Sequence, residues 1–253
     1  MITICTVAGC QLEVETHDRN DRWISRSIVS RGVWEPDETA LIVDRLRPGD
    51  TFIDIGANIG WFTLIASRIV GESGLVIAYE PDPDNFAILD RNIARNGLTN
   101  VVAINAAFST ENARKALFRS TDNMGDHRLF GDDSRESVTV DVVNPCFDWI
   151  RAGLRADFIK SDTQGHEGHV IRALMPYLMQ LDKRPTILAE YWPKGILASG
   201  ENPTEMVRSL YELGYRATVL PNGAFDVQSC TESLTRSNDP ESHVNLVFCP
   251  CGK

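Results

Sequence analysis

The chain has 253 residues, of which 43% are hydrophobic and 24% are charged, and this composition is typical of a globular protein with a sizeable core. It excludes a disordered, collagen-like or fibrous chain. The formal net charge of -10 repels phosphate backbones, so we expect no nucleic acid among the partners of the protein.

The cysteines and the apolar runs indicate the cellular environment. Six cysteines are too few for a disulfide scaffold, and their spacing does not form paired zinc-binding motifs. No apolar run approaches the roughly 18 residues that a membrane-spanning helix needs, and residues 1–5 do not begin a signal peptide. We therefore expect a cytoplasmic protein with reduced thiols and no membrane partner.

The N-terminal part differs in pattern from the rest of the chain. Residues 1–48 are mixed and polar, and they end in a stretch whose apolar residues recur at helical spacing from Pro36 onward. A Pro-Gly-Asp turn follows at 48–50. We expect 1–48 to pack as a small cap on a larger domain formed by 49–253.

From residue 51 short apolar runs, typical of strands, alternate with stretches of helical periodicity. The expected strands are 51–55, 75–79, 101–107, 138–142, 156–160, 186–190, 216–220 and 244–248. The expected helices are 61–70, 83–95, 147–152, 167–180 and 203–213. An irregular insert at 109–136 and a loop at 220–244 interrupt the alternation.

This alternation predicts the fold class. Strands that alternate with helices predict right-handed crossovers and a doubly wound, mostly parallel sheet, so the fold is α/β. The last two strands have no predicted helix between them, which favours an antiparallel hairpin at the end of the sheet. Ligands in such folds bind beyond the carboxyl ends of the strands, and the motifs described next lie there.

The first strand of the domain runs into a glycine-containing loop, DIGANIG. Gly56 and Gly60 allow a tight turn and a close approach of the backbone to a ligand, and the following helix directs its free N–H groups there. A dinucleotide fingerprint would need glycines where Asn58 and Trp61 stand. The pattern therefore favours S-adenosylmethionine over NAD, with Asp54 accepting hydrogen bonds from the cofactor or from its loop.

Two further strand ends suit an adenosine ligand. The second strand is followed by Glu80 and Pro81, and a carboxylate there can accept hydrogen bonds from both ribose hydroxyls. The third strand ends at Asn105 and Ala106, where small residues let an adenine ring lie against the backbone. Glu80 alone would serve NAD equally well, but three such features at three successive strands indicate a cofactor site.

The sequence resembles the FkbM family of S-adenosylmethionine-dependent methyltransferases. The matching stretches are VWEPDE at 33–38, FIDIGANIGWFTLIAS at 52–67, YEPDPDNFAILDRNIARNGL at 79–98, NAAFS at 105–109, DFIKSDTQGHEGHVIRAL at 157–174 and AEYWP at 189–193. The run at 159–167 is the piece most specific to the family. Ser161 and Thr163 depart from it, because the family more often has aliphatic residues on both sides of Asp162.

The resemblance implies a Rossmann-like class I methyltransferase fold. It also implies methyl transfer to a hydroxyl or a similar heteroatom, often on a sugar or a natural-product intermediate. Trp34 and Glu35 precede the core and would close over the cofactor, as in the family, and Trp192 would line the same mouth.

Four polar residues near the ends of the fourth and fifth strands are candidates for the chemistry. Because side chains alternate along a strand, Lys160 and Asp162 share one face, with Asp162 at the ligand-facing end. We expect Asp162 to orient the acceptor and to act as a general base, with His166 as the second candidate base. Lys160 is expected to pair with Asp162 or Glu190. A purely structural ion pair explains Lys160 and Glu190 equally well.

The polar segment 121–128 lies within the insert and contains a glycine that could act as a hinge. Loops in such positions often cover a substrate. Asn123, His127 and Arg128 are therefore candidates for contacts with the acceptor, as is Trp192. A solvated connection explains the segment equally well.

The leading prediction is an enzyme, an O-methyltransferase that acts on a small molecule. The alternatives are N- or carboxyl methylation on the same fold, and a non-catalytic module that binds an adenosine ligand. The second alternative is disfavoured because Lys160, Asp162, His166 and Glu190 are all retained. The sequence leaves open the acceptor, a divalent cation such as Mg²⁺, which Asp162 and Glu190 could hold, and the oligomeric state, a homodimer included.

Overall fold

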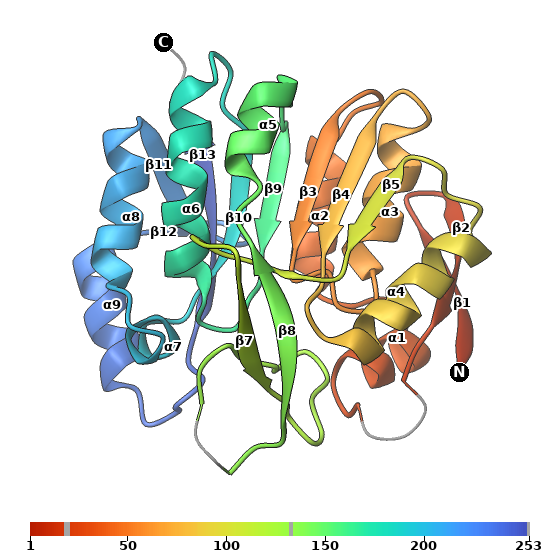
Figure 1. Cartoon of the computed structure of the whole chain (residues 1–253), viewed down its shortest axis with the longest axis horizontal. Coiled ribbons are helices and arrows are strands. Elements are labelled where there is room, and N and C mark those ends of the chain that lie inside the picture. The colour runs from red at the N-terminus through yellow and green to blue at the C-terminus, as the bar shows by residue number, and fades with distance from the viewer. Residues whose placement is uncertain (18–20, 132–133, 252–253) are drawn as a thin grey trace.

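Residues 1–17, 21–131 and 134–251 are described by the computed structural model in Figure 1. Their strands are β1 (Ile2–Val7), β2 (Cys10–Glu15), β3 (Thr51–Ile55), β4 (Leu75–Tyr79), β5 (Val101–Ile104), β6 (Ala107–Phe108), β7 (Ala113–Phe118), β8 (Ser137–Val143), β9 (Phe158–Ser161), β10 (Thr186–Tyr191), β11 (Tyr215–Val219), β12 (Gly223–Ala224) and β13 (Val244–Pro250). Their helices are α1 (Ile24–Arg31), α2 (Pro36–Arg45), α3 (Trp61–Val70), α4 (Pro83–Arg95), α5 (Cys146–Ala152), α6 (Glu167–Gln180), α7 (Pro193–Ala198), α8 (Pro203–Glu212) and α9 (Val227–Arg236). None of the helices in these ranges is long and apolar enough to cross a membrane.

Within the described ranges, an eight-stranded sheet forms the centre of the molecule in the order β12-β11-β13-β10-β9-β3-β4-β5 (Figure 1). Strands β10, β9, β3, β4 and β5 are parallel neighbours, and β13 runs antiparallel to both β10 and β11. The predicted α/β class, with a mostly parallel doubly wound sheet and a terminal antiparallel pair, is therefore confirmed. The strand order reverses between β3 and β9, and folds of this kind bind ligands at such a reversal.

Alternate side chains of the central strands enter two separate hydrophobic cores. Ile53 of β3 packs with residues of α5, α6 and α8, whereas Phe52 packs on the opposite face with α2 and α3. On that second face the rings of Phe52 and Phe158 lie 5.6 Å apart. Because both faces are covered, apolar side chains of β3 point to both faces of the sheet, and Asp54 is a buried polar residue among them.

Side-chain caps fix the starts of two predicted helices. The Asp82 carboxylate accepts hydrogen bonds from the N–H groups of Asp84 at 2.9 Å and Asn85 at 3.1 Å, and Pro83 opens α4. Asn202 caps α8 in the same way. Each cap contributes about 1 kcal/mol, so both helices begin where the sequence predicts them.

The N-terminal extension folds as the hairpin β1-β2 followed by α1 and α2. Leu12 and Val14 of β2 are buried in the same core as α3. The N–H of Glu15 donates to Oδ1 of Asn92 at 2.6 Å, which ties the hairpin to α4. The extension and the sheet therefore share one hydrophobic core.

The prediction of an irregular insert at 109–136 is wrong over part of its length. Residues 113–118 form β7, which pairs with β8, and β6 completes a small sheet in the order β6-β8-β7. Strand β5 ends three residues earlier than predicted, because the N–H of Ala106 turns back to the carbonyl of Ile104. Strand β8 pairs with β6 and β7, so it lies in the small sheet and not in the main one. Positions 132–133 of the insert lie outside the described residues.

The prediction of a loop at 220–244 is also wrong, because this segment contains α9 and the short strand β12. Val227, Cys230 and Leu234 recur at helical spacing and pack against the main core. The polar residues between them conceal this pattern in the sequence. The terminal strands β11 and β13 are thus antiparallel as predicted, but a helix lies between them.

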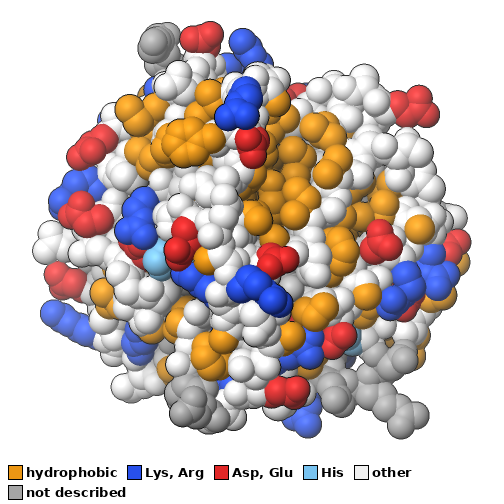
Figure 2. Space-filling model, in the orientation of Figure 1, with side chains coloured by type: hydrophobic (Ala, Val, Ile, Leu, Met, Phe, Trp, Pro, Cys, Tyr) orange, Lys and Arg blue, Asp and Glu red, His pale blue; other side chains and the backbone are white. Residues whose placement is uncertain are grey.

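The face in view in Figure 2 carries a group of hydrophobic side chains over α5 and the neighbouring strands. Val102 of β5 is 50% exposed, and Phe147 of α5 is 65% exposed. Helix α5 has seven residues, against fourteen in α6. The shorter helix leaves part of this face of the sheet uncovered.

Candidate cofactor and catalytic site

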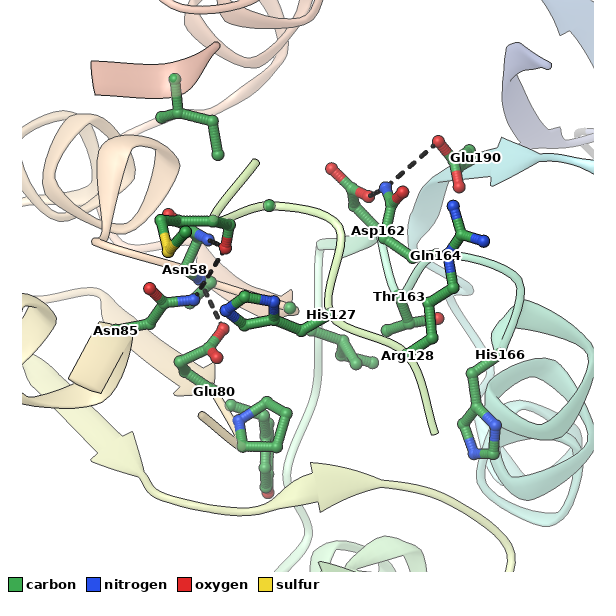
Figure 3. A pocket seen from close by; sticks show the side chains of 18 of the residues that line it. Asn58, Glu80, Asn85, His127, Arg128, Asp162, Thr163, Gln164, His166 and Glu190 are labelled. Atoms are coloured by element: carbon green, nitrogen blue, oxygen red, sulfur yellow. Dashed lines mark hydrogen bonds between the residues drawn. The ribbon is translucent and has the colours of Figure 1, made fainter. Parts of the chain in front are cut away.

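A cavity of about 560 Å³ lies at the carboxyl ends of β3, β4, β9 and β10. Among the residues predicted for the site, it is lined by Glu35, Gly56, Asn58, Glu80, Pro81, Ala106, Asn123, His127, Arg128, Lys160, Asp162, His166, Glu190 and Trp192. In Figure 3, Asn58 and Glu80 lie on one side of the pocket, and Asp162 and Glu190 lie on the other. The predicted residues that do not line it are Asp54, Gly60 and Asn105.

The glycines of the loop after β3 make room for protein atoms. Gly56 has a φ of +84°, and a Cβ there would overlap the backbone oxygen of Asp162. Gly60 has a φ of +94°, and a Cβ there would lie 2.6 Å from Cδ1 of Leu89. Gly60 does not line the cavity, whereas Gly56 lines it and also packs on Asp162, so the approach of a ligand stays a prediction for Gly56.

Glu80 holds the loop in shape from the neighbouring strand. Its Oε2 accepts a 2.8 Å hydrogen bond from the N–H of Asn58, and its Oε1 accepts a 2.9 Å bond from the N–H of Asp82. Burial raises the pKa of Glu80 to about 8, although both N–H groups favour the carboxylate. Carboxylate lone pairs remain available for ribose hydroxyls, because each oxygen can accept more than one hydrogen bond.

Asn105 supports this region from outside the cavity. Its Nδ2 donates to the carbonyl oxygens of Glu80 at 2.8 Å and Pro81 at 3.1 Å. Asn105 does not line the cavity, and its side chain braces the backbone that follows β4. Ala106, next in the chain, lines the cavity as the sequence predicts.

Asp54 is fully buried beneath the loop and does not line the cavity. Its Oδ2 accepts a 2.6 Å hydrogen bond from Oγ1 of Thr63, which belongs to α3. Burial raises the pKa of Asp54. Of the two predicted roles, the structure supports a bond within the protein, to the helix that follows the loop, because Asp54 does not line the cavity.

Lys160 is the cation at the centre of the site, and its side chain is 2% exposed. Its Nζ lies 3.1 Å from Oδ2 of Asp162 and 3.9 Å from Oε2 of Glu38, and it lies over the ring of Phe62. Burial alone would lower the pKa of Lys160, but Asp162 and the neighbouring glutamates outweigh burial and raise it. Of the two predicted partners of Lys160, Asp162 is therefore the one in contact.

Asp162 has both oxygens engaged. Oδ2 faces Lys160, and Oδ1 accepts a 2.8 Å hydrogen bond from Nε2 of Gln164. Burial favours the neutral acid, yet Lys160 and Gln164 together lower the pKa of Asp162. A carboxylate that is stabilised in this way orients its neighbours well but accepts a proton poorly.

Glu190 lies at the end of β10 and faces Gln164, the residue that also contacts Asp162. Its Oε1 accepts a 3.3 Å hydrogen bond from Nε2 of Gln164 and lies 3.7 Å from Nε2 of His243. Its Oε2 is buried and has no hydrogen-bond partner among the described residues. Burial, and then the Asp162 carboxylate, raise the pKa of Glu190 well above its ordinary value.

Glu35 brings a second unpaired carboxylate oxygen to the cavity. It precedes α2 with a φ of +41°, an uncommon conformation for a residue with a side chain. Its Oε2 is buried without a hydrogen-bond partner in the described ranges, and burial raises its pKa. A cationic group of a ligand would satisfy this oxygen, so Glu35 fits the predicted place over the cofactor.

His166 is a weak candidate for the base. Its Nε2 lies 2.9 Å from Oγ of Ser109, and its ring stacks on His169 at 4.2 Å. Burial, followed by the charges nearby, lowers the pKa of His166 to about 3. The ring is therefore neutral near pH 7 and has little affinity for a proton, so its prediction as the second base loses support.

The insert lies over the cavity and is anchored to both sides of it. Nδ2 of Asn58 donates a 2.7 Å hydrogen bond to the carbonyl of Met124, and Nδ2 of Asn85 donates to the same oxygen at 2.9 Å. On the other side, the Arg128 guanidinium lies 4.5 Å from the centre of the Trp192 ring. Of the two interpretations of this segment, these contacts favour a cover over the cavity rather than a solvated connection.

The residues of the insert differ in how free they are to meet a ligand. Arg128 pairs with Asp126 and, at 2.8 Å, with Glu241. Nδ1 of His127 accepts a hydrogen bond from the N–H of Ser120, and burial lowers the pKa of His127. These side chains can position an acceptor by hydrogen bonds and ring contacts, but their charges are already balanced by the protein.

Several cavity residues were not among the predicted ones. Gln164 has a φ of +52° and joins Asp162 to Glu190, and His243 contacts Glu190 from the far end of the chain. Asn85 lies in the first turn of α4, next to the Asp82 cap, and the sequence pattern there indicates only the start of a helix. The unusual φ of Gln164 has no sequence signal, and His243 becomes visible only when β13 is placed beside β10.

The donor set gives a divalent cation no support. Among residues 1–17, 21–131 and 134–251, no group of three or more His, Cys, Asp and Glu side chains is arranged to hold a metal ion. Asp162, one of the two predicted ligands, already faces Lys160. The predicted Mg²⁺ site therefore remains a prediction.

The strand order and the loop between β3 and α3 are those of the class I methyltransferase fold. Residues 54–217 match the methyltransferase FkbM domain, and the chain belongs to this family. The resemblance in the sequence is thereby confirmed. The chain is also 33% identical over 100 residues to "Methyltransferase 1" of Beauveria bassiana. The aligned stretch covers 39% of this chain and 40% of that protein.

Two further relatives carry the family name. The chain is 38% identical over 73 residues to the 31-O-demethyl-FK506 methyltransferase FkbM of Streptomyces tacrolimicus, which covers 29% of this chain and 28% of that protein. The crystal structure of methyltransferase FkbM from Methylobacillus flagellatus KT aligns with a TM-score of 0.47 at 15% identity, over 84% of this chain and 50% of that one. The chain thus spans well under two thirds of the length of these curated relatives.

Proposed function

We propose that this protein transfers the methyl group of S-adenosylmethionine to a hydroxyl group of a small molecule. The observation that carries this proposal is the arrangement of carboxylates along the cavity. Glu80 lies at the end of β4, and Asp162 and Glu190 lie at the ends of β9 and β10. A ligand that spans the cavity therefore meets hydrogen-bond acceptors for ribose hydroxyls at one end and for an acceptor hydroxyl at the other.

Residues on the β4 side suit the cofactor. When bound, S-adenosylmethionine supplies a methyl group that its sulfonium has already activated. Glu80 accepts hydrogen bonds from the ribose, while Pro81 and Ala106 flank the adenine. Glu35 provides an unpaired buried oxygen for a cationic part of the same ligand.

Residues of the insert suit a small acceptor. Asn123, His127 and Arg128 of the insert, together with Trp192 after β10, line the same cavity, whose volume lies in the range of small-molecule sites. The name of the Streptomyces relative refers to a substrate that lacks an O-methyl group. Because Lys160 and Asp162 hold the groups around the acceptor in fixed positions, much of the rate would come from placing the hydroxyl in line with the methyl group.

The direct test is incubation of the purified protein with S-adenosylmethionine and three parallel panels. The first contains hydroxylated sugars, glycosides and phenols, the second amines, and the third carboxylic acids. Mass spectrometry should detect singly methylated products in the hydroxyl panel, with stoichiometric S-adenosylhomocysteine. Products confined to the amine or carboxylate panel would overturn the hydroxyl acceptor, and absence of any methylated product would overturn the proposal.

A further inference from the structure

We propose that Glu190 is the group that takes the proton from the acceptor hydroxyl, and that His243 carries this proton away. The role, which rests on the proposed hydroxyl acceptor, was predicted from the sequence for Asp162. The two carboxylates lie at the ends of adjacent parallel strands, β9 and β10, and both line the cavity. They differ in what already occupies their oxygens.

A general base needs a free lone pair that faces the substrate. Asp162 has Oδ2 on Lys160 and Oδ1 on Gln164, so a proton could bind there only by displacing a partner. Glu190 lines the cavity, and its Oε2, which is buried, has no hydrogen-bond partner among the described residues. A buried acceptor left unpaired by the protein is an unfavourable arrangement unless a ligand completes it.

Glu190 is held by its other oxygen, so its orientation is fixed. Nε2 of Gln164 donates to Oε1 of Glu190 at 3.3 Å and to Oδ1 of Asp162 at 2.8 Å (Figure 3). One side-chain amide thus bridges the two carboxylates. Lys160 and Asp162 position Gln164, and Gln164 positions Glu190.

His243 provides a route for the proton away from Glu190. Nδ1 of His243 lies 2.8 Å from the carbonyl oxygen of Glu241, and because a carbonyl only accepts, Nδ1 carries the hydrogen. In the neutral ring Nε2 is then an acceptor, and it lies 3.7 Å from Oε1 of Glu190. The His243 side chain is 46% exposed, and it also lines a second cavity of about 350 Å³.

The charges around Glu190 set its affinity for a proton. Those that raise its pKa after burial are the carboxylates of Asp162, Glu167, Glu35 and Glu38. Lys160 neutralises the first of them, and His243 is the other titratable side chain in contact. A cation bound in the cavity lowers the pKa of Glu190, so a positively charged ligand converts it to the carboxylate that can act as a base.

The step balances without another reactant. The hydroxyl proton passes to Oε2 of the Glu190 carboxylate. The electron pair of the O–H bond forms the new bond between oxygen and methyl carbon, and the pair of the broken C–S bond stays on sulfur. The carboxylic acid then returns its proton from Oε2 to solvent through Nε2 of His243, with a water molecule as the bridge, because Nε2 lies 3.7 Å from Oε1 and makes no direct hydrogen bond to Glu190.

A test that needs no acceptor compares two ligands by calorimetry. Sinefungin carries a C–NH₃⁺ group where S-adenosylmethionine has its S⁺–CH₃, and S-adenosylhomocysteine lacks a charge there. If Glu190 faces the transferred group, Glu190→Gln should weaken the binding of sinefungin at least tenfold. The same substitution should weaken the binding of S-adenosylhomocysteine less than threefold. Glu35→Gln, the matched control, should weaken both ligands by similar factors.

Other outcomes separate this inference from the proposed function. If Asp162→Asn removes the preference for sinefungin and Glu190→Gln does not, Glu190 is not at the transferred group. If neither ligand binds the wild-type protein, the methyltransferase site itself is misplaced. If Glu190→Gln does not fold, the test uses the wild-type protein. Calorimetry in two buffers of different ionisation enthalpy measures how many protons each ligand releases on binding at pH 7.5, and sinefungin should release up to one more proton than S-adenosylhomocysteine. Equal proton release by the two ligands would overturn the assignment.

The role of His243 is tested on an acceptor found in the hydroxyl panel. His243→Asn should lower kcat at least tenfold and leave the KM for the acceptor within threefold, because His243 moves the proton and does not bind the substrate. Added imidazole, which fits the second cavity, should restore part of the rate. An unchanged kcat would remove His243 from the route.

Discussion

Gly56 and Asp162 touch through their backbones: a Cβ on Gly56 would overlap the carbonyl oxygen of Asp162. The N–H of Asp162 also donates a 3.0 Å hydrogen bond to the carbonyl of Ile55. The loop on the cofactor side and the loop that carries the polar centre are therefore packed as one unit. A change at either loop should move the other.

The first prediction follows from this contact. Gly56→Ala should destabilise the protein by about 3 kcal/mol or more, because the methyl group meets a backbone atom that cannot rotate away. Gly97 is a matched control, since it has a φ of +60° and open space within 4 Å. Gly97→Ala should lose about 1–2 kcal/mol from the left-handed conformation alone. Urea denaturation measures both, and equal losses would contradict the backbone contact.

The second prediction concerns Glu80, which joins the loop to the cofactor. Glu80→Ala removes the acceptor for the N–H of Asn58 and for the ribose, so S-adenosylhomocysteine should bind about 1–2 kcal/mol more weakly, or about 5- to 30-fold. Glu80→Gln keeps one acceptor oxygen and should lose less. Calorimetry measures both affinities, with circular dichroism to verify folding. Unchanged affinity in Glu80→Ala would remove Glu80 from the site.

The third prediction treats Asp162 and Lys160 as a buried ion pair. Asp162→Asn leaves Lys160 with the more distant Glu38, and breaking such a pair costs about 3–5 kcal/mol. Asp162→Asn should therefore lower stability as well as turnover. The double variant with Lys160→Met should be more stable than the sum of the single losses predicts. Additive losses in denaturation would show that the two groups do not interact.

The central sheet and the helices of its crossovers could be predicted because their signals are local. Strand β3 and helices α3, α4 and α6 have the predicted bounds, since a short apolar run marks β3 and helical periodicity marks the helices, and Pro83 and the Asp82 cap mark the start of α4. Strand β7 was missed because Arg114 and Lys115 interrupt its apolar residues. The spacing of Val227, Cys230 and Leu234 was present in the sequence, but the polar residues of α9 hid it.

The residues of the site were easier to predict than their partners. The sequence places Lys160 and Asp162 on one strand, so their contact follows from alternation. It does not reveal that Gly56 packs on Asp162, because that contact joins two strands that are far apart in the chain. The bridge through Gln164 and the contact of Glu190 with His243 depend in the same way on the order of β9, β10 and β13.

The last prediction uses the low pKa of His166 to separate a neutral ring from a general base. Burial sets the pKa of His166 to about 3 in the folded protein, against about 6.5 when unfolded. Between these values the unfolded chain binds more protons, so this contribution to stability is present above pH 6.5 and is lost as the pH falls. From pH 7 to pH 5 the wild-type protein should lose about 2 kcal/mol more than His166→Asn, which cannot titrate.

Urea denaturation at pH 5, 6 and 7 measures this difference, with each protein compared to itself at pH 7. The same variant should leave the acid limb of any pH–rate profile in place, because a group with a pKa of about 3 does not titrate there. If wild type and His166→Asn instead lose stability in parallel, His166 keeps an ordinary pKa near neutrality. It would then regain its place as a candidate base, and the hydrogen bond to Ser109 would orient it rather than reflect a buried, neutral ring.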